Sequence, residues 1–397
     1  MQYRKMGSLD WEVSALGFGC MRLPSRRFSL MGADLEESKR IIRYGIDRGI
    51  NYLDTAWPYH LGESEKVVGE TLKDGYREKV KLVTKLPMFL VHRRSDFDRF
   101  LNVQLDRLQT DVIDIYLFHA LNAGSFQRVK QLGLIAKMEE AQRQGRIRHI
   151  GFSFHDTFPV FKEIIDFYDW DMAQIQYNYM DTCVQATAEG LEYAHGKGIA
   201  VVIMEPVKGG TLANPPQEAA NVIANAPVKR TPVDWALQFL WNKPEVATVL
   251  SGMSNMQQVV ENCDSADGSG IHSLSEEEEQ IITQLAEIYQ RKILVPCTGC
   301  EYCMPCPHGV NISQNFAILN NISLEKSWIR RFQIRRAYRK LASGPPQLDL
   351  ENPNGKASVC IDCGLCLEKC PQEIAIPMEL EKVHAIMGKA DSIEKHF

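Results

Sequence analysis

Two hydrophobic patterns alternate between residues 15 and 265. Short runs rich in β-branched and aromatic residues are typical of buried strands, whereas apolar residues that recur every three to four positions are typical of amphipathic helices. The clearest helices are expected at 35–49, 95–109, 135–146 and 187–198. The eight expected strands are 15–21, 51–56, 80–85, 113–120, 149–154, 173–178, 199–206 and 247–253.

This strict alternation predicts an α/β fold. Alternating strands and helices imply a parallel sheet, and eight repeats imply closure into a (β/α)8 TIM barrel. An open, doubly wound sheet is the alternative, but no G-x-G-x-x-G sequence follows the first expected strand. One more helix is expected at 275–290, where consecutive glutamates in the first turn suit the helix dipole.

The character of the chain changes near residue 291, where a cysteine-rich region begins. A helical pattern at 322–342, a loop rich in proline and glycine at 343–355 and a second run of cysteines follow it. The sequence therefore predicts two domains, a barrel at 1–290 and a small α-helical domain at 291–397.

Composition and charge limit the kinds of molecule that the protein is expected to bind. The 397 residues carry a formal net charge of -5, so no global basic field favours nucleic acid. No apolar run is long enough to span a bilayer, and the N-terminus lacks the apolar core of a secretory signal. We therefore expect a cytoplasmic protein without a membrane or nucleic-acid partner.

Eight of the 11 cysteines lie in two tight runs after residue 296. In a reducing compartment, clustered thiols point to metal ligands rather than to disulfides. The second run has the spacing C-x2-C-x2-C-x3-C-P of bacterial ferredoxins, and the first run is one residue shorter before its last cysteine. The pattern predicts a ferredoxin-like domain with two [4Fe-4S] clusters.

In such runs the fourth cysteine ligates the cluster of the other run, which makes the shorter gap tolerable. The expected ligand sets are Cys297, Cys300, Cys303 and Cys370 for one cluster, and Cys360, Cys363, Cys366 and Cys306 for the other. A pair of structural zinc sites is the alternative, but zinc gains nothing from a third cysteine at the same interval. The isolated Cys20, Cys183 and Cys263 are expected to be small buried residues.

Four polar residues stand at the ends of successive expected strands. Asp54 and Tyr59 follow the second strand, Lys85 ends the third and His119 ends the fourth. Barrel enzymes place their chemistry at these strand ends. A neighbouring ammonium favours the phenolate and lowers a tyrosine pKa from its usual value of about 10. The pattern predicts a proton-transfer site with Tyr59 as general acid or base, although each residue alone could be structural.

The segments NYLDTAWPYHLGESE, KLVTK and YLFHA resemble, in the same order, the signature segments of the aldo-keto reductase superfamily. The whole chain is similar to a branch of that superfamily that is fused to a C-terminal bacterial-type 4Fe-4S ferredoxin domain. The resemblance implies that Asp54, Tyr59, Lys85 and His119 form the catalytic tetrad. It also implies a small carbonyl or alcohol as the substrate.

The same resemblance implies a nicotinamide dinucleotide, NADP or NAD, as cofactor. Ser153 and Gln174 match residues that bind the carboxamide, whereas Phe154 replaces the usual asparagine and Met204 the usual stacking aromatic. Gly252 and Gln258 occupy places that often carry a cation for a 2′-phosphate, which argues weakly against a strong NADP preference. The other implied cofactor-binding residues are Pro206, Gly209, Gly210, Ser254 and Asn262.

Two alternatives to a nicotinamide-dependent reductase remain open. A [4Fe-4S] cluster passes one electron at a time, whereas hydride transfer moves two together, and a flavin can bridge the two regimes. The clusters could therefore feed a flavin or a radical-type reduction in the barrel, with a ferredoxin- or flavodoxin-like protein as donor. The second alternative is a redox sensor or electron-transfer protein on a non-catalytic barrel.

The segment 326–340 is rich in cations with aromatic residues at intervals. One interpretation is a docking face for an acidic electron carrier, because complementary charge accelerates encounter. The sequence favours a simpler interpretation, a connecting helix whose aromatic residues pack on the clusters and whose cations are solvated.

Overall fold

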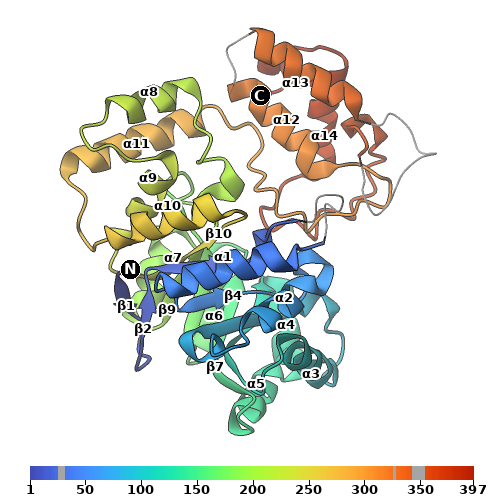
Figure 1. Cartoon of the computed structure of the whole chain (residues 1–397). Coiled ribbons are helices and arrows are strands. Elements are labelled where there is room, and N and C mark those ends of the chain that lie inside the picture. The colour runs from blue at the N-terminus through green and yellow to red at the C-terminus, as the bar shows by residue number, and fades with distance from the viewer. Residues whose placement is uncertain (26–31, 325–327, 342–353) are drawn as a thin grey trace. The chain divides into compact units, whose positions relative to one another are not determined.

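A closed barrel of eight parallel strands forms the core of the N-terminal part of the chain, and all eight expected strands are confirmed (Figure 1). The computed structural model describes residues 1–25, 32–324, 328–341 and 354–397. In the barrel, β10 pairs with β3 and closes the ring. The strands are β3 (Leu16–Gly19), β4 (Tyr52–Asp54), β5 (Lys81–Leu86), β6 (Ile113–Leu121), β7 (Ile147–Phe154), β8 (Met172–Gln176), β9 (Ala200–Met204) and β10 (Val246–Gly252).

Amphipathic helices follow the strands and bury their apolar sides against them. The first of them begins with Asp34, whose side chain accepts a hydrogen bond from the backbone of Glu37 and caps the helix. The four helices expected between strands are confirmed to within three residues at their ends. The helices are α1 (Leu35–Asp47), α2 (Glu63–Thr71), α3 (Asp96–Leu108), α4 (Ala123–Leu132), α5 (Leu134–Arg143), α6 (Phe158–Phe167), α7 (Thr187–Gly196), α8 (Gln217–Asn225), α9 (Pro232–Trp241) and α10 (Met256–Asp267).

A short hairpin, β1 (Tyr3–Lys5) with β2 (Glu12–Ser14), precedes the barrel and was not predicted from the sequence. Its strands have three residues each, too few for a hydrophobic alternation to be recognised. Met6 and Val13 share a buried cluster with Tyr52, at the start of β4. The hairpin therefore closes the N-terminal end of the barrel and leaves the C-terminal strand ends for chemistry.

The alternation of side chains along the strands decides which residues face the barrel interior. Tyr52, Val83 and Leu117 belong to the interior cluster, whereas their neighbours Leu53 and Leu82 pack under the helices. Because the side-chain period of a strand is two, the residue two places further on faces inward as well. The parity of three strands thus aims Asp54, Lys85 and His119 into the mouth of the barrel.

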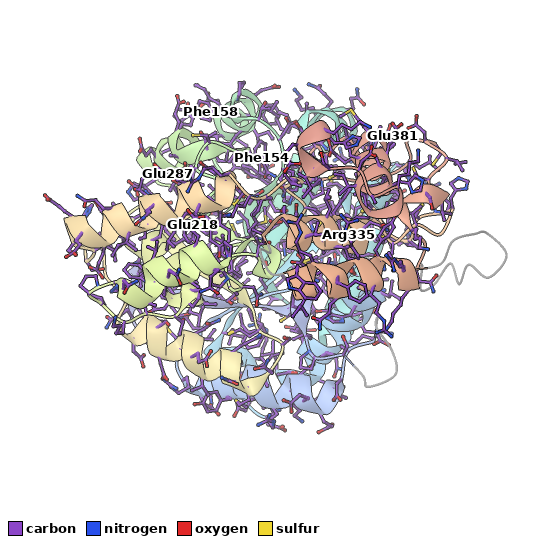
Figure 2. All side chains as sticks on the ribbon, turned by 90° about the horizontal axis from the view of Figure 1, so that it is seen from above. Phe154, Phe158, Glu218, Glu287, Arg335 and Glu381 are labelled. Atoms are coloured by element: carbon purple, nitrogen blue, oxygen red, sulfur yellow. The ribbon has the colours of Figure 1, made fainter. Side chains whose placement is uncertain are left out.

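By packing, the chain divides into two compact units, residues 1–206 with 233–275, and residues 207–232 with 276–397. The second unit, called the module below, begins earlier than the composition change near residue 291. The reason is that α8 packs side by side with α11 (Glu276–Gln290), which confirms the helix expected at 275–290 (Figure 1). Figure 2 marks this pair of helices by Glu218 on α8 and Glu287 on α11.

The rest of the module is helical and has its own apolar core. It contains α12 (Ile312–Leu324), α13 (Trp328–Lys340) and α14 (Ile376–Val383). The helical pattern expected at 322–342 corresponds to the end of α12 and to α13, and its residues 325–327 and 342 lie outside the described residues, as does most of the loop expected at 343–355. Among the helices described, none combines the length and apolar character that crossing a membrane requires.

Candidate active site and cysteine pockets

A buried ion pair lies at the C-terminal end of the barrel. The Lys85 Nζ donates to both carboxylate oxygens of Asp54 at 2.7 Å and to the backbone carbonyl of Thr55 at 2.9 Å. The side chains of Lys85 and Asp54 are 1% and 4% exposed, so almost no water screens the pair. Three acceptor atoms hold the ammonium in one position. A fixed position is what the ammonium needs if it is to act on a neighbouring side chain.

Burial and pairing act on this ion pair in opposite directions. Burial lowers the pKa of Lys85, and the charge of Asp54 opposes that shift. Burial likewise raises the pKa of Asp54, and the charge of Lys85 opposes it. Each partner therefore depends on the other to stay charged.

The Tyr59 hydroxyl lies 3.5 Å from the Lys85 Nζ, and the ammonium stands 5.1 Å from the centre of the tyrosine ring. The rings of Tyr59 and His119 meet edge to face with their centroids 6.1 Å apart. Burial, followed by the charge of Lys85, holds the pKa of His119 well below its usual value, so its imidazole is neutral. The structure brings together all four residues of the expected tetrad.

Sequence reasoning missed a buried network beneath Lys85. The Gln104 side-chain amide donates to the Lys85 carbonyl at 3.0 Å, and its own carbonyl accepts from the Tyr116 hydroxyl at 2.6 Å. The fully buried Glu65 accepts from Thr84 at 2.7 Å. These bonds hold the end of β5 in place, and only the tertiary fold reveals them, because Gln104 lies on α3.

Two of the expected carboxamide-binding residues are buried at the barrel mouth. Gln174 is 2% exposed, and its amide nitrogen approaches the Met204 sulfur at 3.8 Å. Among the described residues, its buried carbonyl oxygen has no hydrogen-bond partner. Because an unpaired buried acceptor is costly, this oxygen is suited to a donor from a bound molecule. Ser153 accepts a bond from the Ala120 backbone at 2.8 Å, which fixes the chain just after His119 and leaves its hydroxyl hydrogen to donate.

The other residues expected to bind the cofactor lie in different surroundings. Phe154 packs into the core against Phe161, with ring centroids 5.0 Å apart, and belongs to the cluster under the helices instead of the interior cluster. Asn262 is buried and donates to the Ser251 hydroxyl at 2.9 Å. Ser254 and Gln258 form a hydrogen bond with each other at the start of α10. Pro206 follows β9, and the next glycines, Gly209 and Gly210, form a turn in which both have positive φ.

A cation not considered from the sequence lies beside the last loop. A Cβ built on Gly252 would stand 3.1 Å from the side chain of Arg22, which follows β3. Because β3 pairs with β10 in the closed ring, the first and last loops are neighbours. Arg22 therefore packs the base of its side chain against the last loop, which itself carries no cation, and the closed topology was the signal that could have revealed this neighbour.

In the module, the two cysteine runs cross as expected. One pocket is lined by Cys297, Cys300, Cys303 and Cys370 together with apolar residues such as Phe316. The other is lined by Cys306, Cys360, Cys363 and Cys366, with Cys303 at its margin. The last cysteine of each run thus faces the pocket of the other run.

Both pockets leave space between their cysteine side chains. Zinc needs four ligands at about 2.3 Å. Among the described residues, no group of three or more cysteine, histidine, aspartate or glutamate side chains is placed to hold a metal ion. The case for clusters over zinc therefore rests on the ferredoxin-like spacing of the cysteines and not on this geometry.

The loop of the first cysteine run touches the turn after β9. A Cβ at Gly209 would stand 1.9 Å from the backbone carbonyl oxygen of Thr298, between Cys297 and Cys300. The φ of Gly209 is also positive, at 62°. Only glycine fits this contact, which gives Gly209 a packing role in addition to any role at the cofactor site.

Two of the three isolated cysteines are buried as expected, and one is not. Cys20 and Cys263 are 0% exposed. Burial and the nearby Asp54 raise the pKa of Cys20 well above its usual value, so this thiol stays protonated. The expectation was wrong for Cys183, which is exposed because it lies in the turns between β8 and α7.

Comparisons with known proteins agree with both parts of the chain. Residues 15–287 match the model of the aldo/keto reductase family, and residues 296–376 match a 4Fe-4S dicluster domain. An uncharacterized oxidoreductase of Bacillus subtilis, YqkF, is 28% identical over 310 residues, which cover 70% of this chain and 94% of that protein.

Solved structures share the barrel. The holo form of the aldo-keto reductase AKR11C1 from Bacillus halodurans has 29% identity and a TM-score of 0.60, and covers 72% of this chain and 96% of that one. A Klebsiella pneumoniae aldo-keto reductase in complex with NADPH has the same fold at 24% identity, with a TM-score of 0.61 and coverage of 72% and 96%. The family match extends over more than half of the chain. This protein is an oxidoreductase that belongs to the aldo/keto reductase family and carries a C-terminal 4Fe-4S domain.

Proposed function

We propose that the barrel reduces a small carbonyl compound, or oxidises the corresponding alcohol, with Tyr59 as the general acid or base. The observation that carries this proposal is the Lys85 ammonium 3.5 Å from the Tyr59 hydroxyl. A cation at this distance favours the phenolate over the phenol. Tyr59 can therefore give up its proton more readily than a free tyrosine.

The neighbouring residues prepare this proton transfer. Asp54 keeps Lys85 charged despite its burial, and the network of Gln104 holds the strand that carries Lys85. The neutral His119 can donate a hydrogen bond to the substrate oxygen without competing for the proton. The burial of these groups excludes water, which strengthens their electrostatic effect.

A nicotinamide dinucleotide fits the same barrel mouth and would supply a hydride. The buried Gln174 oxygen offers an acceptor for a carboxamide N–H, and the Ser153 hydroxyl offers a donor for its carbonyl. The base of the Arg22 side chain packs beside Gly252, so its guanidinium is a candidate to meet the 2′-phosphate of NADP near the last loop. We therefore propose NADP as the cofactor, with NAD as the second choice.

The first experiment compares Tyr59→Phe with the wild-type protein on a panel of aldehydes, using NADPH and NADH separately. We expect kcat to fall by roughly 10²–10⁴-fold, since general acid catalysis contributes about that much. Tyr76→Phe is the matched control, because its hydroxyl bonds the surface residue Asp47 and its loss should leave turnover unchanged. Equal turnover by Tyr59→Phe and wild type would remove the support for Tyr59.

We further propose that the module holds two [4Fe-4S] clusters in the crossed arrangement. The pairing of each run's last cysteine with the other pocket supports this ligand set. The clusters would supply one-electron transfer. The test is the iron, sulfide and extracted-cofactor content of protein prepared without oxygen. About eight iron atoms per chain are expected, because each cluster contains four. Zinc in their place would contradict this proposal, and an extracted flavin would favour the flavin-fed alternative.

A further inference from the structure

Helix α13 exposes large aromatic residues to solvent. Trp328 is 78% exposed and Phe332 is 55% exposed, so the expectation that the aromatic residues of this helix pack on the clusters was wrong for both. Only Tyr338 is buried, at 2% exposure. An exposed tryptophan and phenylalanine one turn apart are uncommon on a surface that has no partner.

Cations occupy the same side of the helix. Trp328, Phe332 and the three arginines of the last two turns are spaced by i, i+4, i+7, i+8 and i+11, which places them on one face of a helix. We call these five residues the α13 face, and they are Trp328, Phe332, Arg335, Arg336 and Arg339. Arg335 is labelled on α13 in Figure 2.

The α13 face is positive although the whole chain is negative. The helix contains no acidic residue, and the formal net charge of the chain is -5. Among the described residues, no acidic side chain forms an ion pair with Arg336 or Arg339. Their positive field is therefore available to an external molecule.

The side of α13 next to the α13 face leads to the second cysteine run. Tyr338 belongs to the apolar core of the module together with Ala357, and Lys356 stands 6.0 Å from the centre of the Tyr338 ring. The segment 357–359 runs directly into Cys360.

The second cysteine run is itself open to solvent. Cys363 is exposed, and the neighbouring Ile361 and Leu365 are 62% and 58% exposed. In contrast, the four cysteines expected to hold the other cluster are all only partly exposed. A cluster held by the second run would therefore have one ligand, Cys363, at the surface, although its ligand from the first run, Cys306, is buried.

We propose that the α13 face is the docking site of a small acidic one-electron carrier protein, which exchanges electrons with the cluster held by Cys306, Cys360, Cys363 and Cys366. The proposal rests on the two clusters proposed above. In one encounter the reduced carrier loses one electron and the cluster gains it, and no atom or proton moves. Complementary charge brings the carrier in, and Trp328 and Phe332 supply contact area.

The composition of the face favours a protein over a membrane. A helix that lies in a membrane surface separates an apolar face from a charged one. Here Phe332 lies between arginines on the same side of the helix, so burying the aromatic residues in lipid would also bury the cations. A mixture of aromatic residues and arginine is typical of protein interfaces.

The test uses the full chain loaded with iron and sulfide and a purified acidic bacterial ferredoxin that has been reduced beforehand. Stopped-flow bleaching of the cluster absorbance gives the second-order rate constant for electron transfer. Arg336→Glu/Arg339→Glu should lower this rate at least about tenfold at low salt and flatten its salt dependence. Trp328→Ser should weaken ferredoxin binding to immobilised protein without changing the salt dependence.

The matched control is Lys229→Glu/Arg291→Glu, which changes the net charge of the same module equally at exposed sites just after α8 and α11. Direct reduction by dithionite should be equally fast in all variants, because it needs no docking. Equal slowing by both double variants, or by neither, would overturn the proposal. So would binding to phosphatidylserine vesicles or to single-stranded RNA that is lost in Trp328→Ser while ferredoxin transfer is kept. Absence of any absorbance that dithionite bleaches would instead contradict the clusters themselves.

Discussion

Replacement of Lys85 by methionine tests the ion pair that prepares Tyr59. Lys85→Met keeps the length of the side chain but removes the ammonium that contacts Asp54 at 2.7 Å. The Asp54 side chain is only 4% exposed, so water cannot replace the lost partner. Removing one partner of a buried pair typically costs about 3–5 kcal/mol. For a domain of this size, about 1 kcal/mol corresponds to a Tm change of ~2–4 °C, so a fall of roughly 6–20 °C is expected.

The double variant Asp54→Asn/Lys85→Met separates stability from catalysis. It leaves no uncompensated buried charge, which is what makes the loss of one partner alone so costly. We therefore expect the double variant to recover most or all of the lost Tm. Carbonyl reduction should stay lost in both variants, because Tyr59 has no ammonium beside it in either one.

The pH dependence gives this reasoning its sharpest test. Burial already raises the pKa of Asp54 in the wild type, and removing the opposing charge of Lys85 must raise the pKa further. A carboxyl group whose pKa is raised by folding stabilises the folded state at low pH, and that contribution is lost as the pH rises through the folded pKa. The Tm gap between Lys85→Met and the double variant should therefore be largest at alkaline pH and should narrow under acid conditions. Calorimetry across this range is the assay, and a gap that is absent or independent of pH would refute the argument.

Three further predictions concern other parts of the chain. Cys370→Ala should lower the iron content by about half and remove the cluster of the first run, which EPR of the reduced protein would detect, while Cys183→Ala should change neither. Gly210→Ala should lower the free energy of unfolding by roughly 1–2 kcal/mol, because its φ is positive. Gly209→Ala should destabilise the module more, because its Cβ would also clash with Thr298. Equal melting temperatures of the two variants would contradict the contact between Gly209 and Thr298. Arg22→Gln should raise KM for NADPH more than for NADH, and equal effects on both would remove this arginine from phosphate recognition.

The inward residues could be predicted from sequence because strand periodicity fixes them. Asp54, Lys85 and His119 stand two places after apolar interior residues, so their direction followed once the strands were located. The bonds that hold them could not be predicted in the same way. Gln104 lies 19 residues from Lys85 on a different element, and nothing in the local pattern of α3 marks it as a partner of β5.

In the cysteine runs and in α13, too, some features could be predicted from the sequence and others depend on the fold. The crossed pairing could be predicted from the likeness of the second run to bacterial ferredoxins, in which the fourth cysteine ligates the other cluster. The exposure of Trp328 depends instead on which side of α13 packs against the module core. The sequence alone does not show whether an apolar residue will contact protein or water. The inclusion of residues 207–232 and of α11 in the module likewise depends on packing, because the sequence of α11 is that of an ordinary amphipathic helix.

The two redox reactions proposed for this chain differ in the number of electrons that move in one step. Hydride transfer at the barrel moves two electrons together, whereas each cluster accepts one at a time. If the module only senses or stores electrons, nicotinamide-driven carbonyl reduction should survive loss of the first cluster. If the clusters feed the barrel, reduction driven by a ferredoxin should need two encounters per turnover and should fail when that cluster is lost. A Cys370→Ala variant that loses ferredoxin-driven turnover but keeps NADPH-driven turnover would show that one tyrosine serves two electron sources.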